Sequence, residues 1–235
     1  MATFALIPAA GSGTRMAGGQ PKQYLPLAGK PMLWHSLKAL ARAPVECIFV
    51  VLAPEDREFA RQDWSALGGR VEPLYCGGAT RRDSVYNGLV AASAVVDPDD
   101  WMLVHDAARP CLPRADFERL IAECGEDRIG GILALPIADT VKRVTRDETR
   151  TDEPGALRIA GTEDRAQLWL AQTPQMFRAG LLGQALKDAK GAVTDEAGAI
   201  EQLGLRPRLV LGSRENLKVT YPEDLAIAEA ILKAR

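Results

Sequence analysis

The chain of 235 residues is long enough for one large domain with a sizeable core, and its 47% hydrophobic and 26% charged residues are typical of a folded globular protein. Its 29 basic and 31 acidic residues give a formal net charge of −2, which does not favour binding to nucleic acid or to an anionic membrane. The longest apolar runs, such as 47–53 and 130–137, are far shorter than the ~18 residues of a membrane-spanning helix.

Short apolar runs alternate along the chain with segments of helical periodicity. The segments 31–43 and 116–124 repeat apolar residues at helical spacing, and Pro222 opens a third helix near the C-terminus. This alternation predicts an α/β fold with a Rossmann-like, mostly parallel twisted sheet, helices on both faces, and ligands beyond the carboxyl ends of the strands. The strands are expected at 3–7, 46–53, 71–76, 101–105, 130–135, 168–172 and 207–211.

Residues 139–164 break this alternation, because they are highly charged and carry only short β-like pieces around Pro154 and Gly155. A segment with so few apolar residues cannot bury itself, so it predicts a β-hairpin arm that leaves the core. A second copy of the chain is the simplest surface for such an arm to contact. We therefore expect a single domain over 1–235, with an arm inserted at about 139–164 that holds a homodimer together.

The N-terminus and the cysteines predict a cytoplasmic location. The N-terminal segment lacks the basic residues of a signal peptide and leads directly into an apolar run. The cysteines occur singly, and with only two histidines in the chain this favours buried free thiols over a zinc site. These thiols are Cys47, Cys76, Cys111 and Cys124.

A glycine-rich stretch, PAAGSGTRM at residues 8–16, follows the first predicted strand. It is not a dinucleotide-binding fingerprint, because Met16 stands at the position of the third glycine, and it is not a Walker A loop, because Gly19 stands where lysine is required. Backbone N–H groups of small residues can still face an anion, and Arg15 and Lys22 add two positive charges at the same edge of the sheet. This combination indicates a triphosphate site.

Further motifs follow in order: PKQYLPLAGKP, GGATRRDSVYNGL, HDAARP, LALPIADTVKR, TPQMF and NLKVT. The N-terminal motif resembles nucleotidyltransferases of the GT-A-like type, and the whole series resembles the 2-C-methyl-D-erythritol 4-phosphate cytidylyltransferase family over nearly the full chain. The resemblance implies transfer of CMP from CTP to methylerythritol 4-phosphate, in the non-mevalonate isoprenoid pathway, with release of pyrophosphate. It also implies Mg²⁺ or another divalent cation, held mainly through the CTP phosphates.

The resemblance assigns residues to both substrates. Arg15 and Lys22 correspond to residues that stabilise the pentacoordinate α-phosphorus, and Arg165 and Lys218 to residues that position the acceptor phosphate. CTP binding is implied for Pro8, Ala9, Ala10, Gly11, Ser12, Gly13, Gly78, Ser84 and Ala107. Acceptor binding is implied for Asp106, Arg109, Thr140, Arg165, Thr173 and Lys218. Because Thr140 and Arg165 bracket the arm, the resemblance also implies that each subunit's arm completes its partner's site.

Asp106 follows a predicted strand, where an open α/β sheet places functional side chains. Its carboxylate could orient metal-bound phosphates or the acceptor, or it could cap the following turn; no other direct protein ligand for the metal is expected. The reaction needs no general base, because a phosphate monoester with a second pKa of ~6 is already an anion at neutral pH. Neither histidine is expected to act as a base: His35 falls in a predicted helix, and His105 ends a predicted strand, where we expect it to pack. Glu196, in the TDEA motif, is expected only in the first turn of a helix.

Other functions remain open at this stage. The acceptor could be another polyol phosphate, such as ribitol 5-phosphate, which would keep the CTP loop and change the acceptor pocket. A non-catalytic CTP-binding module is disfavoured, because it would tolerate the loss of Arg15, Lys22 and Lys218. An NAD-dependent dehydrogenase is disfavoured by Met16 and by the lack of a catalytic base.

Overall fold

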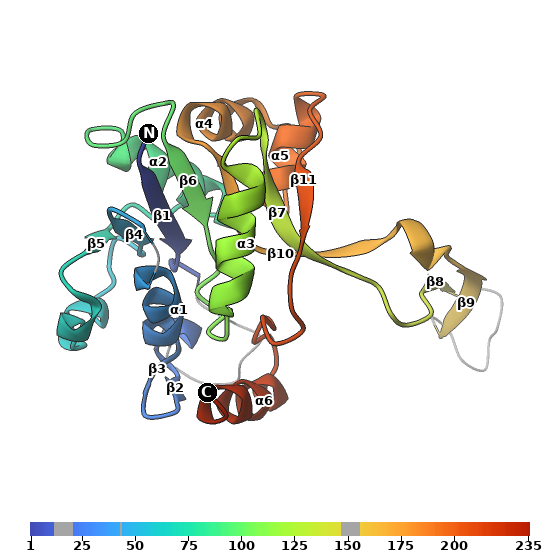
Figure 1. The fold of residues 1–235 in the computed structure, drawn as a ribbon. Coiled ribbons are helices and arrows are strands. Elements are labelled where there is room, and N and C mark those ends of the chain that lie inside the picture. Colours follow the sequence, from blue (N-terminus) through green and yellow to red (C-terminus); the bar gives the residue numbers. More distant parts are fainter. Residues whose placement is uncertain (12–20, 43, 147–155) are drawn as a thin grey trace.

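The computed structural model describes residues 1–11, 21–42, 44–146 and 156–235, and a seven-stranded sheet in the order β11-β7-β10-β6-β1-β4-β5 forms its centre (Figure 1). β10 pairs antiparallel with β6 and β7, and the other pairs in this sheet are parallel. The prediction of a mostly parallel α/β sheet is confirmed. The strands are β1 (Thr3–Pro8), β4 (Ile48–Val51), β5 (Val71–Leu74), β6 (Trp101–Val104), β7 (Gly130–Pro136), β10 (Trp169–Arg178) and β11 (Arg208–Leu211).

The strand expected at 168–172 differs most from the structure, since β10 continues to Arg178. The prediction stopped at the Thr-Pro sequence, because proline donates no hydrogen bond to a neighbouring strand. The structure accommodates Pro174 where the register of β10 against β7 shifts, between Ala171 and Gln175. Strand pairing then resumes, and β10 takes its place in the sheet between β7 and β6.

Helices cover both faces of the sheet, as predicted. α1 (Met32–Ala41) and α3 (Arg114–Cys124) pack on one face, and α2 (Arg81–Ala92), α4 (Ala179–Asp188) and α5 (Glu196–Gln202) pack on the other. The sequence did not predict α2, because its buried positions include Ser84 and Gly88 rather than a stripe of large apolar residues. α6 (Pro222–Lys233), which was predicted, packs against a third, smaller cluster of buried hydrophobic residues.

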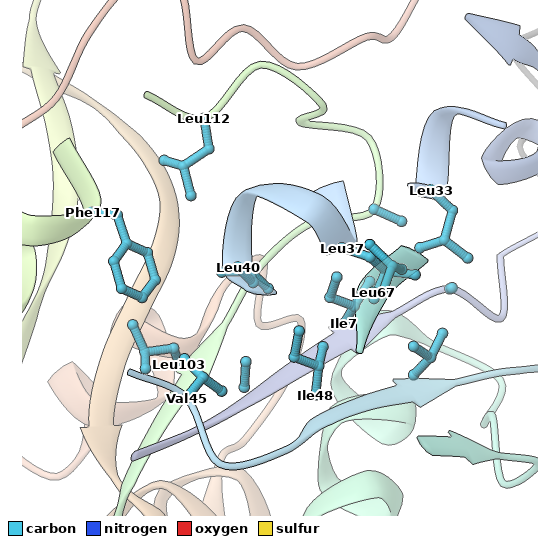
Figure 2. Close-up of a cluster of buried hydrophobic side chains, with 14 of the residues drawn as sticks. Ile7, Leu33, Leu37, Leu40, Val45, Ile48, Leu67, Leu103, Leu112 and Phe117 are labelled. Atoms are coloured by element: carbon cyan, nitrogen blue, oxygen red, sulfur yellow. The ribbon is translucent and has the colours of Figure 1, made fainter. Parts of the chain in front are cut away.

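The two main cores follow from alternation along the strands. In β1, Ala5 and Ile7 face one core, whereas Phe4 and Leu6 face the other. Figure 2 shows the first core, where Leu37 of α1 lies among apolar side chains of the sheet. Helix α1 is thereby fixed against the strand that leads into the glycine-rich loop.

Short elements complete the described chain. They are β2 (Pro26–Leu27), β3 (Lys30–Pro31) and the 3-10 helices η1 (Lys22–Tyr24), η2 (Phe59–Arg61), η3 (Ser65–Leu67) and η4 (Arg165–Gln167). No helix in the described ranges is long and apolar enough to cross a membrane. Among the cysteines, Cys111 and Cys124 are buried as expected, whereas Cys47 and Cys76 are half-buried, and all four thiols are free.

The predicted arm is present. β8 (Lys142–Arg146) and β9 (Leu157–Thr162) form a separate antiparallel pair that stands well away from the central sheet (Figure 1). Three apolar side chains of this pair, Val144, Leu157 and Ile159, are 59% to 66% exposed. The expected turn at Pro154 and Gly155 lies outside the described residues. The arm therefore presents an apolar surface that its own chain does not cover.

Candidate active site

The order of the strands creates a crevice between β1 and β6. The chain runs from β1 to β4 and β5 on one side, and then returns to β6 on the other side of β1. At such a switch point the loops leaving neighbouring strands diverge, which opens space for a ligand. A cavity of about 450 Å³ lies at this position. The described residues that line it are Pro8, Ala9, Ala10, Gly11, Lys22, Gln23, Met32, Gly78, Ala79, Thr80, Arg81, Ser84, Asp106, Ala107, Ala108 and Lys218.

The predicted CTP residues that the structure describes line this cavity. A side chain at Gly78 would overlap Asp83, so the close approach of this loop to α2 requires glycine. The hydroxyl of Ser84 accepts a hydrogen bond of 3.1 Å from the N–H of Gly78 and donates one of 3.0 Å to the carbonyl of Thr80. The described CTP candidates Pro8, Ala9, Ala10, Gly11, Gly78, Ser84 and Ala107 all line the cavity. Ser12, Gly13 and Arg15 lie outside the described residues.

Asp106 is buried and lies among three cations. Its Oδ2 is 2.8 Å from Nζ of Lys218 and 3.8 Å from Nε of Arg109, and its Oδ1 is 3.0 Å from Nη2 of Arg81. Burial alone would raise the pKa of Asp106, but these positive charges outweigh burial and hold the pKa well below its usual range. Asp106 therefore stays ionised, and its carboxylate binds side chains rather than capping the following turn.

Arg81 and Glu196 belong to this cluster, although the sequence did not indicate them as site residues. Nη1 and Nη2 of Arg81 lie 2.6 Å and 3.0 Å from the two carboxylate oxygens of Glu196. Burial lowers the pKa of Arg81, but the two carboxylates raise it above its ordinary value, so the charge persists. Arg81 lies within the GGATRRDSVYNGL motif, and this membership was the one sequence signal that could have identified it as a site residue. Glu196 was expected only as an acidic residue in the first turn of a helix, and it does lie in the first turn of α5.

Both predicted lysines line the cavity. The ammonium group of Lys22 donates to the carbonyl of Val219, next to Lys218 in sequence. The segment that carries Lys218 is held in place by its neighbour Asn216, whose Nδ2 donates a hydrogen bond of 2.8 Å to the carbonyl of Thr173. Nη1 of Arg109 donates to the carbonyl of Asn216 over 2.6 Å. The NLKVT motif thus brings its lysine to Asp106 through buried polar contacts.

His105 and Thr173 lie behind the cavity. The Thr173 hydroxyl accepts a hydrogen bond of 3.0 Å from the N–H of Asp106 and contacts Nδ1 of His105 over 3.0 Å. Nε2 of His105 lies 3.1 Å from the carbonyl of Arg109, which requires the proton on Nε2 and leaves Nδ1 to accept from Thr173. Burial lowers the pKa of His105 to about 4, so the ring is neutral at pH 7. The geometry agrees with the expected packing role of His105.

Several predicted acceptor residues are not brought to the cavity within one chain. Among the described residues that line it, Arg109, Thr140, Arg165 and Thr173 are missing. Arg109 and Thr173 are buried directly behind Asp106, whereas Thr140 and Arg165 are exposed near the base of the arm. The guanidinium of Arg165 donates to the carbonyl of Ala138 in its own chain.

The donor groups of the cavity suit a metal ion that arrives with a nucleotide. Within the described ranges, no group of three or more His, Cys, Asp and Glu side chains is placed to hold a metal. Asp106 is the one carboxylate among the described lining residues. Mg²⁺ commonly takes one or two carboxylates together with substrate phosphates and water. Asp106 could therefore serve as such a carboxylate, and a cation held mainly through CTP phosphates stays a prediction.

Comparisons with known proteins agree with one another. The family model described as IspD, 2-C-methyl-D-erythritol 4-phosphate cytidylyltransferase, matches residues 3–234. A protein of that name from Dechloromonas aromatica is 55% identical over 233 residues, covering 99% of this chain and 98% of the relative. A solved structure described as 4-diphosphocytidyl-2C-methyl-D-erythritol synthase is 40% identical, with a TM-score of 0.83 and 98% of each chain covered. The corresponding cytidylyltransferase from Thermus thermophilus is 30% identical, with a TM-score of 0.76, covering 99% of this chain and all of the other.

Proposed function

The chain belongs to the 2-C-methyl-D-erythritol 4-phosphate cytidylyltransferase family, and from this premise we propose how its residues divide the work of the reaction. The reaction transfers the cytidylyl group of CTP to 2-C-methyl-D-erythritol 4-phosphate. An oxygen of the acceptor phosphate forms a bond to the α-phosphorus of CTP, and the bond from that phosphorus to the departing pyrophosphate breaks. The family match favours this function over a ribitol phosphate enzyme, a CTP-binding module or a dehydrogenase.

One observation carries the division of roles: Lys22, Asp106 and Lys218 line the same cavity as a loop of small residues. The loop's N–H groups would bind the CTP phosphates. Lys22, together with Arg15, would neutralise the charge that grows on the α-phosphate as it is attacked. Lys218 would hold the acceptor phosphate near it, because the main obstacle is to align two anions.

Asp106 would orient the substrates and hold the divalent cation that accompanies CTP. When bound, that cation supplies further neutralisation of phosphate charge. The carboxylate of Asp106 contributes through its position, because the neighbouring cations hold its pKa well below the usual range and keep it ionised at pH 7. It also separates the positive charges of Arg81, Arg109 and Lys218, which would otherwise repel one another.

We further propose that residues 1–235 act as one nucleotidyltransferase domain within a cytoplasmic homodimer. The arm stands away from its own sheet, and its exposed apolar side chains suit contact with a second copy of the chain (Figure 1). Thr140 and Arg165 would then reach the acceptor side of the partner's cavity. Their absence among the described lining residues of their own cavity supports this arrangement.

Pyrophosphate release tests the function directly. The purified protein is incubated with Mg²⁺, each of the four nucleoside triphosphates, and either methylerythritol 4-phosphate or ribitol 5-phosphate. Turnover is expected with CTP and methylerythritol 4-phosphate. Turnover with ATP but not CTP would contradict the assignment, and turnover with ribitol 5-phosphate alone would favour the other polyol phosphate.

A further inference from the structure

The guanidinium of Arg81 joins two carboxylates that come from distant parts of the chain. Nε lies 3.1 Å from Oδ1 of Asp106, while Nη1 and Nη2 lie 2.6 Å and 3.0 Å from the two oxygens of Glu196. All three nitrogens of the fork are therefore engaged. Arginine is suited to this position because its planar group presents fixed donors in two directions, which lysine cannot do.

We propose that Arg81 and Glu196 are positioning residues for cytidylyl transfer, and that together they fix the carboxylate of Asp106. The proposal rests on the function proposed above, in which Asp106 orients the substrates. Glu196 fixes the guanidinium of Arg81, and the same guanidinium in turn donates a hydrogen bond to Oδ1 of Asp106. Oδ2 then faces Lys218, 2.8 Å away, with Nε of Arg109 at 3.8 Å.

Both ends of this bridge are anchored to rigid elements. Arg81 follows Thr80, whose side chain accepts a hydrogen bond from the N–H of Asp83 in a capping box at the start of α2. The same turn carries Ser84, a predicted CTP residue that lines the cavity, so the bridge fixes the position of Asp106 relative to that residue. Glu196 begins α5, after Asp195, whose side chain caps that helix.

A second contact holds α5 to the sheet. Nε2 of Gln175, in β10, donates to Oδ2 of Asp195 over 2.9 Å, and Oε1 of Gln175 accepts from the N–H of Ala197 over 2.8 Å. Glu196 lies between these two contacts and is fully buried. A buried ion pair contributes little net stability compared with apolar packing, so orientation is the effect that this arrangement explains best.

Loss of the fork should reduce the reaction with the acceptor more than the binding of CTP. In Glu196→Gln, Arg81 keeps its charge but loses the bidentate contact. We expect kcat to fall about 10- to 100-fold, because a small displacement of an orienting group costs this much in rate, while KM for CTP changes less than about 3-fold. Arg81→Lys should behave in the same way, since it keeps the charge and lacks the fork.

Asp116→Asn is the matched control. Asp116 is also a buried carboxylate in the first turn of a helix, and it pairs with Arg119 over 3.2 Å, but it is not among the described residues that line the cavity. Its substitution should leave kcat within about 2-fold of the parent chain. A comparable loss of kcat in this control would overturn the proposal, because any buried ion pair would then have the same effect.

A double-mutant cycle decides whether Glu196 acts through Asp106. If it does, the variant with both Glu196→Gln and Asp106→Asn should have the same kcat as Asp106→Asn alone. Multiplication of the two losses would overturn the inference while leaving the role of Asp106 intact. Full activity of Asp106→Asn would overturn both. If Glu196→Gln does not fold, as judged by circular dichroism, the cycle is run with Arg81→Lys instead.

Discussion

Gln23 donates a hydrogen bond of 2.7 Å from Nε2 to the carbonyl oxygen of Ala9. Gln23 is buried in η1, and Ala9, the first residue after β1, lines the cavity. Because a peptide unit is planar, holding the carbonyl of Ala9 also sets the direction of the N–H of Ala10. The direction of the Ala10 N–H, which we propose binds a phosphate of CTP, therefore depends on a side chain outside the glycine-rich stretch itself.

Removal of this contact should weaken CTP binding. Gln23→Ala is expected to raise KM for CTP about 5-fold with a smaller effect on kcat, since one hydrogen bond contributes about 1 kcal/mol. Steady-state kinetics measure both constants. Gln202→Ala is the control, because Gln202 also bonds the backbone, at Lys190, but is exposed on α5. The same KM in both variants would show that the bond does not order the loop.

Lys22→Ala should reduce kcat by about 10²-fold if the ammonium group stabilises the transition state. A rapid-quench measurement of the transfer step separates this effect from slow product release. Lys187→Ala provides the control, since this lysine lies in the last turn of α4, on the face of the sheet that does not carry α1. An unchanged transfer rate in Lys22→Ala would reduce Lys22 to a structural contact with Val219.

The neutral His105 predicts a pH dependence of stability. In the unfolded chain a histidine titrates near pH 6.5, whereas burial lowers the pKa of His105 to about 4. The unfolded state therefore binds a proton first as the pH falls. The contribution of His105 to the free energy of unfolding is constant above about pH 6.5. Between pH 6.5 and about 4, this contribution declines by up to ~1.4 kcal/mol per pH unit.

His105→Asn should flatten that decline, because its side-chain oxygen can still accept from Thr173 but does not titrate. Urea unfolding between about pH 4.5 and 7.5 measures the slope in both proteins. His35 also has a lowered pKa, caused first by burial, so part of the slope should remain. Identical slopes for the parent chain and His105→Asn would contradict the burial of an uncharged ring.

Two helical glycines should respond oppositely to alanine. At Gly88 of α2, a Cβ would lie 2.5 Å from Val51 and 2.7 Å from Leu6, so Gly88→Ala should destabilise the fold by about 1–3 kcal/mol through overpacking. At Gly183 of α4 a Cβ meets nothing within 4 Å, so Gly183→Ala should stabilise by about 0.5–1 kcal/mol. Thermal and urea unfolding measure both changes. A loss of stability at Gly183 would contradict the open space beside α4.

The proposed dimer predicts that a charge on the arm separates the subunits. Ile159→Asp should weaken association at least about 10-fold, because it places a carboxylate in an apolar contact. Sedimentation equilibrium measures the mass. Val90→Asp, on an exposed apolar position of α2, should leave the mass unchanged. A parent chain that is monomeric at micromolar concentration would contradict the dimer itself.

A shared site predicts recovery of activity on mixing two inactive variants. In a hybrid of Lys22→Ala and Arg165→Ala subunits, one cavity keeps Lys22 and receives an intact arm from its partner. Random exchange of equal amounts should then restore about a quarter of the parent activity, since half the dimers are hybrids with one complete site each. No recovery after exchange would contradict a site that Arg165 completes from the partner.

Much of the site was predictable because its signals are local in sequence. The loop of small residues, Lys22 and the strand that precedes Asp106 each occupy one short stretch, and the parallel sheet brings strand ends to one edge. The contacts of Asp106 were not predictable in this way. Arg81 and Glu196 are separated by 115 positions, and Glu196 by local criteria fits only a helix start.

The amino-acid sequence by itself determined the α/β alternation, the arm, several residues that line the cavity and the family, because these depend on periodicity, turn residues and short motifs. The tertiary structure alone decided that Asp106 sits among three cations, that Thr173 is buried behind it, and that Arg165 is not among the described residues that line the cavity of its own chain. The physical reason is that charge pairing depends on distances of a few ångströms. Only the packed sheet and helices set those distances between residues far apart along the chain.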